Sequence, residues 1–183
     1  MELKGKRIAF LMANEGVEQI ELTEPWKAVE EAGGRPVLVA PEAGKVQAYN
    51  HLDKADTFRV DETLAETDPQ KFDGLMMPGG VANPDLLRMI PEAVDFVQSF
   101  CAAGKAVAAI CHAPWMLVEA GAAKGRTLTS WPSLKTDIRN AGGTWVDEEV
   151  HTDNGIVTSR KPDDLPSFCK KMIEEFAEGR HGR

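Results

Sequence analysis

The chain has no excess of positive charge and no long apolar run. Its 21 lysine and arginine residues are outnumbered by 29 aspartate and glutamate residues, which gives a formal net charge of -8. Nucleic-acid-binding proteins usually present a basic stripe, so we expect no nucleic-acid partner. The longest apolar run near the amino terminus, residues 8–13, is far shorter than the roughly 20 residues that span a bilayer, and no signal-peptide pattern is present. We therefore expect no membrane partner and a cytoplasmic location.

Cysteine is scarce, and the common ligand and cofactor motifs are absent. The three cysteines, Cys101, Cys111 and Cys169, form no C-x-x-C pair. An odd number of cysteines in a reducing compartment argues against a disulfide framework and leaves at least one thiol free for chemistry. The histidines show no H-x-x-x-H or comparable spacing, so we expect no metal site. We expect no cofactor, because P-loop and dinucleotide fingerprints are also absent.

Apolar strand patterns alternate with helical patterns along the whole chain, and no linker or repeat interrupts them. Longer strands are predicted at residues 7–13, 35–40, 105–110 and 156–159, and residues 72–80 are predicted to form a buried strand followed by a glycine-rich turn. Short strands are predicted at 127–129, 144–150 and in a side hairpin within 46–60, which includes His51 and has no assigned role. Helices are predicted at residues 18–32, 84–103 with a break near Pro91, 112–120, 133–141 and 163–178. This alternation predicts one α/β domain over residues 1–183, with a mainly parallel sheet covered by helices on both faces.

Three loops directly follow predicted strands. They read "ANEGVEQ" after the first strand, "PGGVANPD" after the third and "CHAP" after the fourth. Parallel strands end at a common edge of the sheet, and ligands of such proteins bind there. We therefore expect these loops to form one candidate site.

Cys111 lies where a buried strand ends and a helix is predicted to begin. Unpaired N–H groups and the positive end of the helix dipole favour ionisation of a thiol placed there, and the thiolate is the nucleophile. The layout resembles the nucleophile elbow of hydrolases, although the serine motif is absent. The alternative is that Cys111 is only a small apolar residue at a packed junction, the role we expect for Cys101 and Cys169.

His112 is the candidate base. Adjacent side chains on a helix do not face each other, so a hydrogen bond from His112 to Cys111 requires a strained backbone at Cys111. A carboxylate is also needed to orient the imidazole. A hinge or surface histidine remains the alternative.

Two acidic residues are candidates for the same edge. Glu18 could point over the sheet toward Cys111, where shielding would raise its pKa and let a protonated carboxyl donate to the thiolate. The alternative is an ordinary first-turn acid that the helix dipole favours. Asp85, after the glycine turn, is equally compatible with a solvated helix start.

The "PGG" turn at Pro78, Gly79 and Gly80 lets the backbone come close to a ligand. The N–H groups of Gly80 and His112 could form an oxyanion hole for an attacked carbonyl. The alternative is a tight turn that needs glycine only for its dihedral angles.

Taken together, these motifs resemble the ThiJ/PfpI superfamily. "AICHAP", "MPGG" after "FDGL", "GVEQIELTEP" and "TSWPSLKTDIRNAGGTWVDEEV" occur in the family's order over residues 6–178. The resemblance is closest to the PfpI-type branch of intracellular proteases and stress proteins. It implies a flavodoxin-like three-layer α/β sandwich with a nucleophile elbow, related to class I glutamine amidotransferase domains.

The resemblance also implies residue roles. Cys111 would be the nucleophile, Glu18 the acid that hydrogen-bonds its sulfur, and His112 the catalytic histidine. The carboxylate for His112 would come from the "PGG" loop of a neighbouring subunit, which implies a homodimer or a larger homo-oligomer. Asp85 matches the position where the branch typically has glutamate, one methylene longer.

A second departure from the family pattern is "HAPW", where "HGPQ" is common. Trp115 is expected to narrow or re-shape the pocket, and Trp131 to add to the same wall.

The activities assigned to the branch include peptidase, deglycase and glyoxalase-like action, chaperone behaviour and protection from oxidative stress. We predict a cysteine-dependent hydrolase that acts in stress response on a small carbonyl or peptide substrate. The alternatives are a non-catalytic redox sensor or chaperone with an oxidisable Cys111, and an inactive scaffold retained for its dimer surface.

Overall fold

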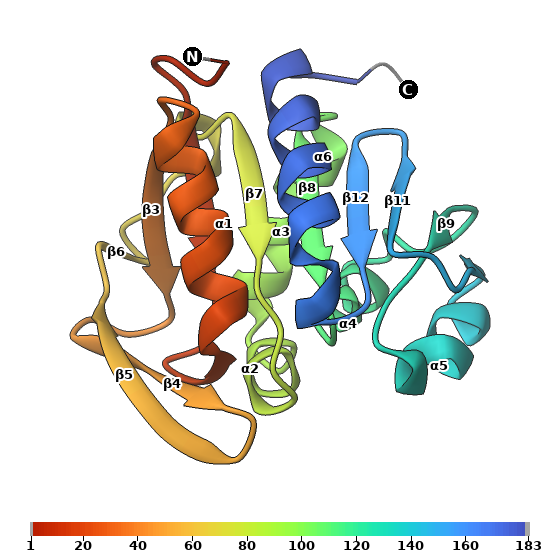
Figure 1. Cartoon of the computed structure of the whole chain (residues 1–183), viewed down its shortest axis with the longest axis horizontal. Coiled ribbons are helices and arrows are strands. Elements are labelled where there is room, and N and C mark those ends of the chain that lie inside the picture. Colours follow the sequence, from red (N-terminus) through yellow and green to blue (C-terminus); the bar gives the residue numbers. More distant parts are fainter. Residues whose placement is uncertain (1, 182–183) are drawn as a thin grey trace.

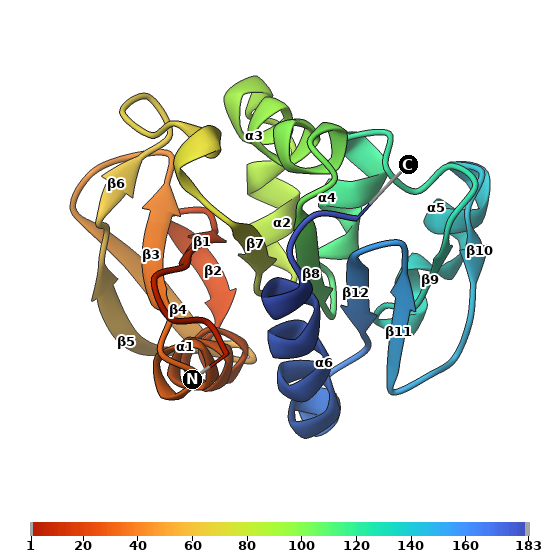
Figure 2. The same ribbon diagram turned by 90° about the horizontal axis from the view of Figure 1, so that it is seen from above.

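The computed structural model describes residues 2–181 and has three layers, a central sheet between two layers of helices (Figures 1 and 2). The sheet order is β11-β12-β8-β7-β1-β3-β6, and every neighbouring pair is parallel except β11 and β12. Its strands are β1 (Arg7–Leu11), β3 (Arg35–Ala40), β6 (Glu62–Thr63), β7 (Gly74–Met77), β8 (Ala106–Ile110), β11 (Val150–Asp153) and β12 (Ile156–Ser159). The predicted flavodoxin-like α/β class is confirmed.

Both faces of the sheet are buried, which explains the continuous apolar strands. Side chains alternate along β1, so that Ile8 and Phe10 join one core cluster while Ala9 and Leu11 join the other. Figure 2 shows α1 (Gln19–Glu31) and α6 (Leu165–Glu178) on one side of the sheet. On the other side lie α2 (Ala82–Leu87), α3 (Pro91–Ala102) and α4 (Pro114–Glu119). The remaining helices are α5 (Lys135–Asn140) and the short 3-10 turns η1 (Pro69–Lys71), η2 (Pro132–Leu134) and η3 (Pro162–Asp164).

Two small sheets flank the central one. The predicted side hairpin is confirmed as β4 (Lys45–Asn50) and β5 (Asp53–Arg59), and β2 (Glu15–Glu18) pairs with β4 to complete a three-stranded sheet. The other pair is β9 (Thr127–Leu128) and β10 (Thr144–Trp145), which lies outside the central sheet.

Several predicted boundaries are wrong. The helix expected from residue 18 begins at Gln19, because the four residues before it form β2. The helix expected over 84–103 is two helices, and the break predicted near Pro91 is confirmed, since Pro91 opens α3 after an extended Ile90. The strand expected over 144–150 is divided between β10 and β11.

The carboxyl ends of β1, β7 and β8 lie at one edge of the sheet. Ala9 of β1 is in register with Leu75 of β7, and Met76 of β7 with Ala108 of β8, all in parallel pairs. The three polar loops therefore open on a common edge, as predicted. The described residues nearest the two ends lie at the opposite, amino edge of the sheet, where the Leu3 N–H donates to the Ala32 carbonyl before β3 and Arg180 pairs with Lys105 before β8. Among residues 2–181, no helix has the length and apolar character needed to cross a membrane.

Candidate active site

Cys111 occupies a sharp backbone turn immediately after β8. Its φ is 62°, a left-handed value that is uncommon for any residue but glycine. The turn is fixed on both sides, because the Cys111 N–H donates to the Ser159 carbonyl at 3.0 Å and the Cys111 carbonyl accepts from Trp131 N–H at 2.8 Å. A strained backbone that its surroundings over-determine is typical of functional sites. The predicted elbow geometry is confirmed.

The strained turn places the Cys111 sulfur against the next residue's side chain. Sγ lies 3.1 Å from Nδ1 of His112, although the two residues are adjacent in sequence. The N–H groups of Gly80 and His112 also hydrogen-bond the sulfur and act to lower the pKa of the thiol. These are the two donors predicted for an oxyanion hole, and both point at the Cys111 sulfur. Their role toward an attacked carbonyl stays a prediction.

A fully buried carboxyl, that of Glu21, faces the thiol. Its Oε2 accepts from the Gly79 N–H at 2.8 Å, and its Oε1 makes no hydrogen bond of standard geometry within the described residues. Burial, with a smaller contribution from the nearby charge of Glu18, raises the pKa of Glu21 to about 8. The carboxyl is therefore mostly protonated at neutral pH and can donate to the Cys111 sulfur, with which it interacts.

The prediction that Glu18 is the acid against the sulfur is wrong in position. Glu18 lines the pocket, but its Oε2 accepts from the backbone N–H of His51 at 3.0 Å. The prediction assumed that a helix starts at Glu18, whereas Glu18 is the last residue of β2 and the acid in the first turn of α1 is Glu21. Glu21 lies in the same segment of the sequence, but only the pairing of β2 with β4 decides which of the two acids reaches the sulfur.

The resting thiol is harder to ionise than the helix-dipole argument predicted. Burial raises the pKa of Cys111 above its ordinary value, and above about pH 8, where Glu21 is ionised, the negative charge of that carboxylate raises it further. Burial also lowers the pKa of His112 to about 4, so the imidazole is neutral at pH 7 and can accept a proton. The resting pair is therefore a neutral thiol beside a neutral base.

Two tryptophans hold the His112 ring. Trp131 stacks on it with ring centroids 5.8 Å apart and an interplanar angle of 22°, and Trp131 also lines the pocket, as predicted. Trp115 meets the same ring edge-on at 5.3 Å. Trp115 does not line the cavity, so the prediction that it narrows the pocket is wrong. Its Nε1 donates to Asp137, and its contact with His112 leaves the alternative, that it shapes the pocket through that ring, as a prediction.

No carboxylate of residues 2–181 forms an ion pair or hydrogen bond with His112. Asp85 lies on α2 at the rim of the pocket and makes neither contact with the imidazole. The role predicted for Asp85 across a subunit boundary therefore stays a prediction.

Only glycine fits at position 79, because the gap between Glu21 and Cys111 leaves no room for a Cβ atom. A Cβ there would lie 2.5 Å from Glu21 Oε2, 2.7 Å from the Cys111 Cβ and 2.8 Å from the Ile110 carbonyl. Its N–H is taken by Glu21, so Gly79 serves packing, and the predicted oxyanion donor of this loop is Gly80.

We expect Gly79→Ala to lower the free energy of unfolding by about 3 kcal/mol, because an over-packed buried site costs typically 1–3 kcal/mol and two of the neighbours here are backbone or Cβ atoms. Urea unfolding followed by circular dichroism measures this loss. Gly121→Ala is the matched control, since a Cβ at Gly121 meets nothing within 4 Å and its φ of 70° adds only backbone strain. Equal losses in the two variants would contradict the packing role of Gly79.

A cavity of about 740 Å³ opens above the Cys111 sulfur. Glu15, Glu18 and Asp85 contribute its charged rim, and Trp131 and Leu52 contribute apolar surface. The cavity is large enough for a small carbonyl compound or one peptide side chain.

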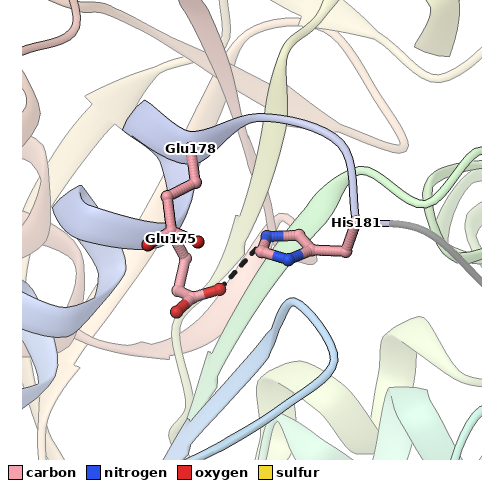
Figure 3. Close-up of side chains that lie close together, drawn as sticks. All are labelled: Glu175, Glu178 and His181. Carbon is pink, nitrogen blue, oxygen red and sulfur yellow. Dashed lines mark ion pairs between the residues drawn. The ribbon is translucent and has the colours of Figure 1, made fainter.

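One group of side chains elsewhere in residues 2–181 has the composition of a metal site. Ligand atoms of Glu175, Glu178 and His181 lie within 4.8 Å of one another near the carboxyl terminus (Figure 3). The ion pair between His181 Nε2 and Glu175 Oε2, 3.1 Å apart, is sufficient to explain the grouping. The expectation that the protein uses no metal stays a prediction.

The fold and the elbow define an α/β protein with a cysteine at the carboxyl edge of its sheet, and comparison with known proteins identifies the family. Residues 6–175 match the DJ-1/PfpI family. The chain therefore belongs to the DJ-1/PfpI family, and the resemblance inferred from the sequence motifs is confirmed.

Individual relatives agree with this assignment. The deglycase PfpI of Pyrococcus furiosus is 36% identical over 168 residues, which cover 92% of this chain and 98% of that protein. YraA of Bacillus subtilis, which carries the name of a cysteine protease, is 39% identical over 168 residues, covering 92% and 96%. The crystal structure of Drosophila melanogaster DJ-1beta superposes with a TM-score of 0.85 at 29% identity, covering 94% of this chain and 90% of that one.

Proposed function

We propose that the protein is a cysteine-dependent hydrolase of the PfpI type, with Cys111 as nucleophile and a peptide or carbonyl adduct as substrate. The observation that carries the proposal is the arrangement around one sulfur. It lies 3.1 Å from a neutral imidazole and accepts hydrogen bonds from two backbone N–H groups. The names of the relatives, deglycase and cysteine protease, support the same chemistry.

The first step would transfer the thiol proton of Cys111 to Nδ1 of His112 as the sulfur attacks the carbonyl carbon. A C–S bond forms, and the π electrons of the carbonyl move to its oxygen, which the N–H groups of Gly80 and His112 stabilise. This coupled transfer removes the need for a standing thiolate, whose formation burial opposes.

The next step depends on the substrate. With an amide, the oxyanion collapses, the C–N bond breaks and the proton on His112 passes to the leaving nitrogen. An amide leaves an acyl-thioester, which water hydrolyses to a carboxylic acid and the free thiol. An aldehyde gives a hemithioacetal at Cys111 by the same first step.

We further propose that the protein works as a homo-oligomer in which Asp85 of one copy orients His112 of another. The support is that His112 has no carboxylate partner among the described residues, while Asp85 is exposed at the pocket rim. A catalytic histidine generally needs such an orienting group.

The burial and the raised pKa of the Cys111 thiol disfavour the redox-sensor alternative. Oxidation follows thiolate character and exposure. Burial raises the pKa of Cys111, and only 7% of the residue is exposed. A thiol that is readily oxidised at rest would need a lowered pKa and an exposed sulfur.

A substrate screen with selective alkylation tests the proposal. The wild-type protein and a Cys101→Ser, Cys169→Ser variant are assayed on methylglyoxal, on methylglyoxal-modified peptides and on unmodified peptides. The variant, in which Cys111 is the only cysteine, is assayed before and after alkylation by iodoacetamide, as verified by peptide mass. We expect turnover of at least one class and its loss in proportion to Cys111 alkylation. Before alkylation, the variant should keep the activity of the wild-type protein. Turnover that survives complete alkylation of Cys111 would refute the proposal.

A further inference from the structure

The pocket above Cys111 has an unbalanced charge. Four carboxyl side chains line it, those of Glu15, Glu18, Glu21 and Asp85, and no lysine or arginine of the described chain does. Because burial raises the pKa of Glu21 to about 8, the negative charge at pH 7 comes from the other three. Two histidines also line the pocket: His112 is neutral at pH 7 because burial lowers its pKa to about 4, and the backbone N–H of His51 donates to Glu18. The lining therefore holds no permanently cationic side chain that could bind an anion.

The acidic side chains are held in place. Glu15 and Glu18 begin and end β2, which pairs with β4. Glu15 Oε1 accepts from the Tyr49 hydroxyl at 2.6 Å, and Glu18 Oε2 accepts from the His51 N–H at 3.0 Å. Both partners lie on or next to β4, so the short sheet fixes the two carboxylates toward the cavity.

Apolar surface accompanies these charges. Leu52 is 94% exposed and Val81 60% exposed, and both line the pocket together with Trp131. Such a surface suits an aliphatic chain whose charged end reaches a carboxylate.

We propose that the pocket selects substrates that carry a positive charge on a short aliphatic stem next to the reacting carbonyl, and rejects substrates that carry a carboxylate there. The proposal rests on the proposed function for the identity of the reacting atom, and it names the substrate class of that site.

The physical basis is long-range electrostatics inside a partly enclosed cavity. Clefts lined by charges of one sign raise the local concentration of oppositely charged ligands by factors of 10 to 1,000. Glu15 and Asp85 are exposed at the rim, where salt screens part of the field, so we expect the low end of this range.

The test uses the Cys111 thiol as a probe, independently of any turnover. Three methanethiosulfonates of matched chain length carry a trimethylammonium, an uncharged or a sulfonate end. In each case the sulfur of Cys111 attacks the sulfenyl sulfur, a disulfide forms and methanesulfinate leaves. Rates at Cys111 are followed by peptide mass at low ionic strength and are divided by the rates of the same reagents with 2-mercaptoethanol. We expect the cationic reagent to react about tenfold faster than the anionic one, and the ratio to fall in 1 M salt.

Cys101 provides an internal control, because the charged side chains around it include lysine and arginine. It lies in a separate cavity that Lys105 and Arg126 line, and Arg126 acts to lower the pKa of this thiol. The cationic-to-anionic ratio at Cys101 should therefore be below one in the same sample. An identical preference at the two cysteines would mean that the reagents or the net charge of -8 decide the order, which would overturn the proposal.

Glu15→Gln tests which residue sets the preference. We expect it to lower the ratio at Cys111 about threefold and leave the ratio at Cys101 unchanged, whereas Glu42→Gln, outside the pocket, should change neither. Equal rates of the three reagents at Cys111, or no reaction there with any of them, would overturn the proposed selectivity. These rates require no catalysis, so a protein that fails the substrate screen but keeps the charge order refutes the proposed hydrolase and leaves the selectivity standing.

Discussion

Cys111→Ser should reduce turnover by at least about 10³-fold on any substrate that the wild-type protein processes. A serine hydroxyl is a much weaker nucleophile than a thiol, and its activation needs a base that is oriented for it. The imidazole 3.1 Å from Sγ has a pKa that burial lowers to about 4, so it is a weak base for a serine hydroxyl. Steady-state kcat/KM for wild type and variant measures the effect.

Cys101→Ser and Cys169→Ser are the matched controls for this prediction. Both cysteines are free and half-buried, and neither lines the pocket above Cys111. Each variant should keep kcat/KM within about twofold of wild type. The Cys111→Ser protein should also unfold at the same urea concentration as wild type within error, because serine fills nearly the same volume. Turnover that persists in a folded Cys111→Ser protein would remove Cys111 from the mechanism.

Glu21→Gln should remove a large pH dependence from the stability of the fold. The carboxyl has a pKa of about 8 in the folded protein against 4.5 in the unfolded chain, so the folded state binds more protons between these values. The free energy of unfolding of wild type should therefore be highest near pH 4.5, relative to the variant, and fall as the pH rises through 8. The relative loss approaches about 5 kcal/mol, since each pKa unit is worth about 1.4 kcal/mol.

Glutamine suits this test because its amide oxygen can still accept from the Gly79 N–H. The quantity to measure is the difference in unfolding free energy between the two proteins, by urea titration at several pH values from 5 to 9. Glu24→Gln, on the same helix α1, should leave the wild-type slope intact. A difference that does not change with pH would show that Glu21 titrates normally, and its assignment as a protonated donor to Cys111 would fail.

The shared edge of the sheet could be predicted because it depends on local patterns. Short apolar segments such as residues 106–110 are flanked by glycine, proline or helical periodicity, and these signals fix the order of strands and helices. The right-handed crossover rule then places Cys111, Gly80 and the loop after β1 at the same edge. The elbow could be predicted from the same local pattern. A hydrogen bond between the adjacent residues Cys111 and His112 requires a strained backbone turn directly after β8.

The acid could not be placed, because its identity depends on a tertiary pairing. Residues Glu15–Glu18 have no strong strand signal of their own, and they become β2 only because β4, about 30 residues later, supplies hydrogen-bond partners. That pairing shifts the start of α1 and exchanges Glu18 for Glu21 at the sulfur. The raised pKa of the thiol has a similar origin, since burial by distant segments is invisible at the level of a motif.

The opposite placement of Leu3 and Arg180 and of the reactive edge has a practical consequence. Leu3 and Arg180, close to the two ends of the described chain, lie at the amino edge of the sheet, on the side away from Cys111. A purification tag, a surface tether or a fused partner can therefore be attached at either end without covering the entrance through which substrate arrives. Immobilised protein should accordingly retain the accessibility of its thiol that the free protein has.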